Sequence, residues 1–203
     1  MNLDFVYHNL RPEMRIITGK YKGRHFDIPR SFKARPTTDF AKENIFNVLT
    51  GLTDFDGAVA LDLFAGTGSI SLELLSRGCL SVVSVEMDRD HAAFIRQCMD
   101  RIGAENNILV RGDVFRFLKT CRQRFDFIFA DPPYALANLE ELPDLILSGG
   151  LLKEDGILVF EHGKKNDFST HPNFIDHRSY GSVNFSIFRE AATTDDGTEG
   201  GDS

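Results

Sequence analysis

The sequence has no tryptophan and only three cysteines among its 203 residues. The cysteines are odd in number, widely spaced and without a CxxC pair, which argues against a disulfide framework and against a structural zinc site. No apolar run approaches the roughly 18 to 20 residues that span a bilayer, and the first residues lack the basic-then-apolar pattern of a secretory signal. The six histidines form no metal-spaced cluster. These absences favour a cytoplasmic protein with no membrane segment and no metal site.

Positive charge is also scarce, since the net charge is −7, but it is unevenly distributed. Nine basic residues stand against three acidic ones between Arg11 and Lys42, whereas the chain from Glu190 onward carries five acids and no base. A basic N-terminal block could dock the phosphates of a nucleic acid while the rest of the surface repels them. The alternative is a solvated hairpin whose basic residues only keep strand edges soluble.

The N-terminal quarter of the chain is predicted to be a small extension. Residues 1–13 show no periodicity and are interpreted as a flexible leader, with Met14 as an alternative natural start. Residues 15–29 indicate two short strands in a hairpin that carries basic residues. Thr38 is expected to cap a helix with one apolar face. Together these features predict an RNA-facing extension of hairpin and helix over residues 14–53.

From residue 54 onward, short apolar runs alternate with amphipathic helical segments. Near-continuous apolar runs, such as 127–130, are typical of central parallel strands covered on both faces. Two final strands joined near Gly181 predict an antiparallel hairpin that closes the sheet. The pattern predicts a doubly wound, mostly parallel α/β sheet of seven strands over 54–190, followed by a disordered acidic tail at 191–203. The expected strands are 58–64, 80–86, 107–113, 125–130, 156–161, 174–180 and 183–188, and the expected helices are 69–77, 90–102, 114–120 and 138–147.

A glycine-containing loop between Leu61 and Ser69 (Leu-Asp-Leu-Phe-Ala-Gly-Thr-Gly-Ser) lies where the first of these strands passes into a helix. Its two glycines allow a tight turn and the close approach of a ligand. Ser71 stands at the position of the third glycine in the dinucleotide fingerprint. Asp62 would repel a diphosphate but can accept hydrogen bonds from an ammonium group. We therefore expect a zwitterionic ligand without phosphates, bound by Asp62, Phe64, Ala65, Gly66 and Gly68.

Two further acids end the next two predicted strands. Glu86, beside Met87, can accept hydrogen bonds from both hydroxyls of a ribose. Asp113 can accept from an adenine amino group, while Val114 offers its backbone N–H to the ring. Singly, such acids are more often solvated carboxylates, but three at successive strand ends predict a cofactor that contains a nucleoside. A nicotinamide dehydrogenase is the alternative that this loop leaves open.

The string Asp131-Pro132-Pro133-Tyr134 follows the fourth of these strands and is expected beside the cofactor. An exocyclic amino nitrogen has its lone pair delocalised into the base, and methyl transfer from a sulfonium requires that this pair point at the methyl group. Two acceptors for the N–H hydrogens, the Asp131 carboxylate and the Pro132 carbonyl, favour this and stabilise the developing positive charge. The prolines hold the carbonyls rigid, and Tyr134 can stack on a flipped base. A stiff loop with a capping aspartate is the alternative.

These residues together resemble the class I methyltransferases of amino groups and, more closely, the RsmD-type family of bacterial small-subunit rRNA guanine-N2 methyltransferases. The resemblance runs from about Arg15 to Arg189, and its specific part is the basic hairpin followed by Arg35-Pro-Thr-Thr-Asp39. It implies a Rossmann-like class I fold and S-adenosylmethionine as cofactor. It also implies that the substrate is N2 of one guanine in 16S rRNA, presented in a small-subunit ribosomal particle.

Contacts with the RNA are expected from the basic extension. The role of Arg35 stays open between an RNA phosphate, the carboxylate of the cofactor and a contact that only stabilises the fold. The expected RNA-binding residues are Lys20, Lys22, Arg24, Arg35 and Thr37.

Three other functions remain open. A DNA adenine-N6 methyltransferase would share the Asp-Pro-Pro-Tyr string, but no insertion here is large enough to read a DNA sequence. A protein-glutamine methyltransferase typically carries Asn where this chain has Asp131. A non-catalytic RNA-binding assembly factor that retains the fold would act without the Asp131 carboxylate.

Overall fold

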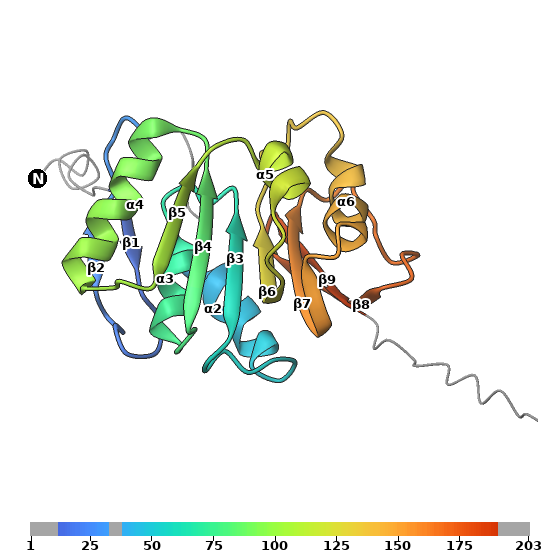
Figure 1. Cartoon of the computed structure of the whole chain (residues 1–203), viewed down its shortest axis with the longest axis horizontal. Helices are drawn as coiled ribbons and strands as arrows, with labels where there is room; N and C mark the ends of the chain where they lie inside the picture. The colour runs from blue at the N-terminus through green and yellow to red at the C-terminus, as the bar shows by residue number, and fades with distance from the viewer. Residues whose placement is uncertain (1–11, 33–37, 191–203) are drawn as a thin grey trace, which may run out of the picture.

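The computed structural model describes residues 12–32 and 38–190, so the expected acidic tail and most of the expected leader lie outside the described residues. A seven-stranded sheet with helices on both faces forms the main body, and a two-stranded sheet near the N-terminus lies beside it (Figure 1). Within the described ranges, none of the helices has the length and apolar character needed to cross a membrane.

The large sheet has the strand order β5-β4-β3-β6-β7-β9-β8. Strands β3 to β7 are parallel, β9 pairs with β7 in antiparallel register, and β8 pairs with β9. This arrangement confirms the predicted doubly wound, mostly parallel sheet that a hairpin closes. The strands are β3 (Val59–Leu63), β4 (Ser81–Glu86), β5 (Asn107–Arg111), β6 (Phe125–Ala130), β7 (Leu152–His162), β8 (Phe174–Tyr180) and β9 (Val183–Arg189).

The strand order of the sheet reverses between β3 and β6. From β3 it moves through β4 to β5 on one side, and it then returns to β6 and β7 on the other. Doubly wound sheets bind ligands at the carboxyl ends of the strands at such a switch point. The backbone N–H of Asp131, just after β6, lies 3.4 Å from the carbonyl oxygen of Leu63 at the end of β3. The topology thus places the two predicted motifs side by side.

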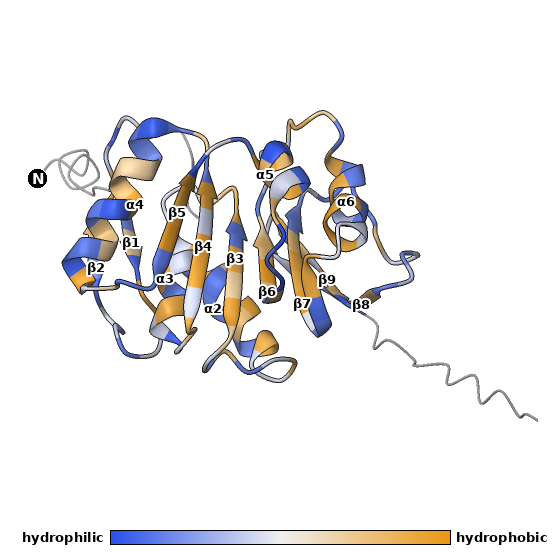
Figure 2. Cartoon of the chain, in the orientation of Figure 1, coloured by the Kyte–Doolittle hydropathy of each residue, from blue (hydrophilic) through white to orange (hydrophobic). Residues whose placement is uncertain are grey.

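Alternate residues of the central strands point into two hydrophobic cores, one on each face. In β6, Phe127 and Phe129 pack in the core shared with α2, α3 and α4, whereas Ile128 and Ala130 pack in the core shared with α5 and α6. Figure 2 shows the apolar character of these central strands. Burial on both faces explains their continuous apolar sequence. The helices are α2 (Asp39–Leu49), α3 (Ser69–Ser76), α4 (Arg89–Ile102), α5 (Val114–Thr120) and α6 (Leu142–Ser148), with the 3-10 helix η1 (Leu139–Glu141) before α6.

Some predicted boundaries shift by a few residues for identifiable reasons. Thr38 caps α2 as predicted, because its hydroxyl accepts a hydrogen bond from the backbone N–H of Ala41 at 3.2 Å. Strand β5 ends at Arg111 and not at Asp113, because Asp113 caps α5. The helix predicted over 138–147 is divided into η1 and α6, since Pro143 lies in the first turn of α6, where its missing N–H costs no hydrogen bond.

The predicted N-terminal hairpin is present as β1 (Glu13–Arg15) and β2 (His25–Asp27), joined by residues 16–24. Within this connection Gly19 has φ +86, and an added Cβ would lie 1.8 Å from the carbonyl oxygen of Ser76 at the end of α3. No residue with a side chain fits there. Residues of the hairpin and of α2 belong to the same hydrophobic core as α3 and α4, so the extension packs directly onto the main domain.

Glu73 of α3 anchors the hairpin, and its side chain is fully buried. Its carboxylate accepts hydrogen bonds from the backbone N–H groups of Ile17 at 2.7 Å and Thr18 at 3.1 Å, and from Nε of Arg77 at 2.9 Å. The Arg77 guanidinium in turn lies 4.4 Å from the ring centroid of Phe46 in α2. A single carboxylate therefore connects the hairpin, α3 and α2.

Replacing Glu73 by alanine should lower the free energy of unfolding by about 3–5 kcal/mol, because it leaves a buried guanidinium and two backbone N–H groups without their acceptor. Glu73→Gln keeps one acceptor oxygen and should lose less. Urea unfolding followed by circular dichroism measures both. Glu43→Ala, at an exposed position of α2, is the control and should change stability by less than about 0.5 kcal/mol. Equal losses in the Glu73 and Glu43 variants would contradict the anchoring role.

Candidate active site

The loop between β3 and α3 has a left-handed backbone at three positions: Phe64 (φ 62), Gly66 (φ 56) and Gly68 (φ 76). For a residue with a side chain, such as Phe64, this conformation costs about 1–3 kcal/mol and is typical of ligand sites. At Gly68 an added Cβ would lie 2.9 Å from Cγ1 of Ile95, so glycine lets α3 approach α4. At Gly66 the nearest atom to an added Cβ is 3.8 Å away, which leaves room for a ligand beside the backbone.

Asp62 lies just before this loop and is 2% exposed. Its Oδ2 accepts hydrogen bonds from the backbone N–H and the hydroxyl of Ser71 in α3, and the Ser71 hydroxyl also contacts the hydroxyl of Ser84 at 2.6 Å. Burial raises the pKa of Asp62 to about 7; the hydrogen bonds from Ser71 oppose this rise, and the nearby Glu86 adds to it. Ser71, where the dinucleotide pattern has glycine, therefore holds this acid in place.

Glu86 ends β4 and holds the loop from the other side. Its Oε2 accepts a hydrogen bond from the backbone N–H of Gly66 at 2.7 Å, and its Oε1 accepts one from the backbone N–H of Asp88 at 2.7 Å. A carboxylate oxygen has two acceptor sites, so each can still receive a ribose hydroxyl. The next residue, Met87, follows the end of β4 and is 68% exposed.

Asp113 does not end a strand, as the sequence pattern predicted, but caps α5. Its Oδ1 accepts a hydrogen bond from the backbone N–H of Arg116 at 2.9 Å, and the residue is exposed. The adjacent Val114 is buried and is the first residue of α5, where a backbone N–H has no partner within the helix. The capping position still lies beyond the carboxyl end of β5, so a carboxylate and a backbone donor stand together at the ligand edge.

The segment Asp131-Pro132-Pro133-Tyr134 leaves the carboxyl end of β6 beside the loop after β3. Asp131 is partly buried, Pro132 is buried and Pro133 is exposed. Tyr134 is 50% exposed, and its hydroxyl donates a hydrogen bond to Oε1 of Glu161 at 3.0 Å. The tyrosine is thus fixed at its hydroxyl end while part of its ring stays accessible.

Glu161, near the end of β7, is a buried acid to which the sequence pattern assigned no role. It is 5% exposed and is joined to the Asp131 carboxyl by a side-chain hydrogen bond. Burial, together with the carboxyls of Glu161 and Asp62, raises the pKa of Asp131 well above its usual range. A signal was present in the sequence, because Glu161 ends the strand predicted at 156–161 and so falls on the ligand edge.

Acids from four neighbouring strands therefore line one edge of the sheet. They are buried or partly buried, and their oxygens are held by backbone N–H groups, hydroxyls or one another. In the described part of the chain, no group of three or more His, Cys, Asp or Glu residues is arranged to hold a metal ion. Such an edge suits a cationic ligand and neutral hydrogen-bond donors. The acids are Asp62, Glu86, Asp131 and Glu161.

The basic residues in the turn of the hairpin do not join this edge. Lys20, Lys22 and Arg24 are exposed, and the backbone N–H of Lys20 donates to the carbonyl oxygen of Ser76 at the C-terminal end of α3. The candidate cofactor loop lies at the opposite end of this eight-residue helix, which is roughly 12 Å long. Two other predicted RNA contacts, Arg35 and Thr37, lie outside the described residues.

Lys42, which belongs to the basic block of the sequence, is buried and serves the fold. Its Nζ donates to the carbonyl oxygen of Arg15 at 2.6 Å and to the hydroxyl of Ser69 at 2.9 Å, and it lies 3.8 Å from Oδ1 of Asp39. Burial lowers the pKa of Lys42, against the opposing effect of Glu73 and Asp39. This lysine fastens the hairpin to the start of α3, directly behind the cofactor loop.

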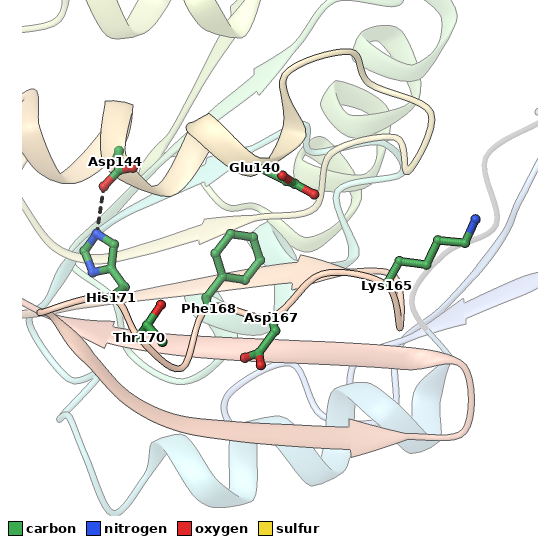
Figure 3. A pocket seen from close by; sticks show the side chains of 7 residues that line it. All are labelled: Glu140, Asp144, Lys165, Asp167, Phe168, Thr170 and His171. Atoms are coloured by element: carbon green, nitrogen blue, oxygen red, sulfur yellow. Dashed lines mark hydrogen bonds and ion pairs between the residues drawn. The ribbon is translucent and has the colours of Figure 1, made fainter.

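A hollow of about 440 Å³ lies between α6 and the loop that follows β7 (Figure 3). There, His171 Nε2 lies 2.8 Å from Asp144 Oδ1, which ties the loop to α6. The same loop begins at Gly163, where an added Cβ would lie 3.7 Å from Cδ2 of Tyr134. The hollow includes none of the predicted site residues. It is lined by Glu140, Asp144, Lys165, Asp167, Phe168, Thr170 and His171.

Comparisons with known proteins agree with this geometry. The family model described as Conserved hypothetical protein 95 matches residues 14–189. The chain is 31% identical over 188 residues to Ribosomal RNA small subunit methyltransferase D of Escherichia coli K12, covering 91% of this chain and 94% of that protein. It is 37% identical over 156 residues to the Putative rRNA methyltransferase YlbH of Bacillus subtilis, covering 75% and 84% respectively.

Solved structures share the same architecture. The structure of the Putative methyltransferase yhhF from Escherichia coli has a TM-score of 0.78 at 28% identity and covers 89% of this chain and 99% of its own. That of a hypothetical protein, TTHA0928, from Thermus thermophilus has a TM-score of 0.76 at 29% identity, with coverages of 86% and 98%. Since the family model and the relatives span nearly the whole chain, this protein belongs to the Conserved hypothetical protein 95 family, together with the ribosomal RNA small subunit methyltransferases D.

Proposed function

We propose that this protein transfers a methyl group from S-adenosylmethionine to the exocyclic N2 of a guanine in 16S ribosomal RNA, within a small-subunit particle in the cytoplasm. One observation carries the proposal: the strained loop after Asp62 and the Asp131-Pro132 segment leave adjacent strands at the switch point of the sheet. The names of the Escherichia coli and Bacillus subtilis relatives support an rRNA substrate. The choice of guanine N2 rests on the sequence resemblance and on the chemistry of the Asp131 segment.

The residues at the edge fit the proposed cofactor. The side chains of Ser71, Glu86 and Asp131 act on Asp62, and none of them is a cation. The ammonium group of the methionyl part would therefore offset the cost of the buried charge of Asp62. Glu86 would accept the ribose hydroxyls. The open space beside the backbone of Gly66 leaves room for the cofactor. The remaining contacts, to the adenine ring and its surroundings, would come from Phe64, Ala65, Gly68, Met87, Asp113 and Val114.

The Asp131 segment would orient the reacting amine. Its carboxylate and the Pro132 carbonyl accept the two N–H hydrogens, so the nitrogen lone pair points away from the plane of the base and toward the methyl group. When bound, S-adenosylmethionine would supply the methyl group on a sulfonium, and its sulfur would keep the electron pair of the bond that breaks. The Asp131 carboxylate would also stabilise the positive charge on nitrogen until one N–H proton passes to solvent water. The accessible ring of Tyr134 can stack on the base, which is worth about 1–3 kcal/mol.

Asp131→Ala should lower kcat for methyl transfer by about 10²–10³, because one of two aligned acceptors is removed. The assay incubates labelled methyl donor with unmodified small-subunit particles and analyses the nucleosides, with N2-methylguanosine as the expected product. Binding of the donor by the variant should change little, which shows that it is folded. N6-methyladenosine or label in protein would redirect the assignment. A variant that still supported the same cellular outcome would favour a non-catalytic assembly factor.

Binding of the cofactor should release a proton from Asp62. In the free protein this carboxyl has a pKa of about 7, so it is mostly protonated at pH 6, and a bound ammonium group favours its charged form. Calorimetry at pH 6 in buffers of different ionisation enthalpy should detect close to one proton released per cofactor bound. Asp62→Asn should bind the cofactor more weakly and release none. Equal proton release from both proteins would remove Asp62 from the cofactor site.

The raised pKa of Asp62 also makes the free protein less stable as pH rises. Its folded pKa lies above the unfolded value of about 3.9, so between about pH 4 and 7 the folded state binds more protons than the unfolded state. The stability contributed by this proton is therefore present at acid pH and lost by about pH 7, at about 1.4 kcal/mol per pH unit as an upper limit. Asp62→Asn should lack this fall in urea unfolding.

Replacing Lys20, Lys22 and Arg24 together by alanine should weaken binding to rRNA and flatten its dependence on salt. For each phosphate that is no longer bound, the slope of log affinity against log salt should fall by roughly 0.7–0.9. Filter binding with particles between low and moderate salt measures the slope. Cofactor affinity should stay unchanged, because these residues lie at the far end of α3 from the loop. An unchanged slope would remove the docking role.

A further inference from the structure

Asp131 is partly buried and Glu161 is buried. The parallel strands β6 and β7 pair Ala130 with Phe160, so the next residues, Asp131 and Glu161, lie side by side, and a side-chain hydrogen bond joins their carboxyls. An ionised carboxylate is an acceptor only, so a hydrogen bond between two carboxyls requires one of them to carry a proton. If both were ionised, two like charges would stand side by side in a buried site, which is the situation that raises the second ionisation of a carboxyl dyad. The raised pKa of Asp131 therefore indicates that the pair keeps one proton and one negative charge over a range of pH.

The location of that proton decides whether Asp131 can act in the proposed reaction. A neutral Asp131 would use one oxygen as a donor and would stabilise a developing positive charge poorly. A charged Asp131 accepts strongly from the amine. Burial and the neighbouring carboxyls raise the pKa of Asp131, so its proton needs a nearby acceptor when the amine binds. Glu161 is in direct contact and is the acceptor that the geometry offers.

We propose that Glu161 is a positioning residue that acts through Asp131. It takes the shared proton when the target amine binds, and it donates that proton as a hydrogen bond to one oxygen of Asp131, leaving the other oxygen to accept from the amine. The proton moves only between two carboxyl oxygens, so no further reactant is needed. The inference rests on the proposed methyl transfer to an amino nitrogen.

Tyr134 connects this pair to the base. Its hydroxyl donates to Oε1 of Glu161 at 3.0 Å, which fixes the rotation of the Glu161 carboxyl. The same tyrosine offers its accessible ring for stacking. If the ring moved when a base binds, its hydroxyl would therefore shift the Glu161 carboxyl, and this shift would change the hydrogen bond between Glu161 and Asp131.

The other side chains around the Asp131–Glu161 pair either form hydrogen bonds with other residues or carry no charge. Asp62 on β3 is an acid and adds to the effect on Asp131. On β7 the next residue, His162, is buried, and its Nε2 lies 2.9 Å from the Ser186 hydroxyl; burial lowers the pKa of this imidazole. On β9 the residue opposite Glu161 is Phe185, which is apolar. Asp131, whose carboxyl forms a hydrogen bond with that of Glu161, is the group with which Glu161 exchanges its proton.

Glu161→Gln and Glu161→Ala separate this role from a structural one. The glutamine amide keeps an acceptor for Tyr134 and a permanent donor for Asp131 but cannot titrate. The kcat of Glu161→Gln should fall by no more than about tenfold, which is the effect expected from weakening one hydrogen bond. Alanine removes both contacts and should lower kcat by about a hundredfold or more. Glu141→Gln, at an exposed position of η1, is the matched control.

The pH dependence of kcat gives the decisive readout. The wild type and the Glu141 control should show a bell, because activity needs the pair with one proton and falls when the second proton is lost. Glu161→Gln has a single ionisation, so its activity should rise with pH to a plateau without the alkaline fall. A bell in Glu161→Gln identical to that of the wild type would overturn the proposal, and so would loss of activity as complete as in Glu161→Ala.

A measurement without RNA distinguishes failure of this proposal from failure of the proposed function. Carbon-13 NMR of labelled aspartate carboxyls should show Asp131 titrating in two linked steps in the wild type and in one step at lower pH in Glu161→Gln, with Asp131→Asn for assignment. Identical titration of Asp131 in both proteins would overturn the carboxyl pair, whatever the enzyme methylates. If the pair titrates as expected but particles yield no N2-methylguanosine, the substrate assignment fails and the pair stands.

Discussion

Burial of negative charge at the carboxyl edge of the sheet is the constraint on which the site depends. A buried carboxylate costs free energy unless donors or a cation surround it. Asp62 has two hydrogen bonds from Ser71, Glu86 has two backbone N–H groups, and Asp131 shares a proton with Glu161. These contacts lower the cost without cancelling it, since the pKa of Asp62 is still raised to about 7. A bound cationic ligand would therefore offset the remaining free-energy cost of the buried negative charge.

The N-terminal extension supports this edge from behind. Lys42 joins the carbonyl of Arg15 to the hydroxyl of Ser69, the first residue of α3, and Glu73 joins the hairpin to the middle of the same helix. Because α3 also supplies the hydrogen bonds that hold Asp62, its position sets the geometry of the cofactor loop. Displacement of the hairpin would therefore reach the cofactor loop through α3, although no hairpin residue is among the acids of the site.

Periodicity and chain order were enough to predict most of the fold. Continuous apolar runs identified the central strands, and motifs at strand ends converged at the switch point as parallel topology requires. The features that could not be predicted depend on side-chain environment. Asp113 caps a helix, and Glu161 acquires a role only through contact with Asp131 and Tyr134. Lys42 turns inward although other basic residues of the N-terminal block, such as Lys20 and Lys22, are exposed. Charge patterns do not reveal which way a lysine points. The strand end placed Glu161 on the ligand edge, but its pairing with Asp131 depends on side-chain contacts that the sequence pattern does not show.

In the proposed function, the distance between the basic turn and the acidic edge would account for how a protein of net charge −7 selects a base. A phosphate entering the acidic edge would meet uncompensated carboxylates, whereas a nucleobase is neutral and presents N–H donors that those carboxylates accept. Lys20 and Lys22 lie at the other end of α3, roughly 12 Å away, where phosphates can be held without competing for the site. In the proposed function, the same acids that make the free edge unfavourable would exclude the backbone of a nucleic acid and admit the amino group of one of its bases.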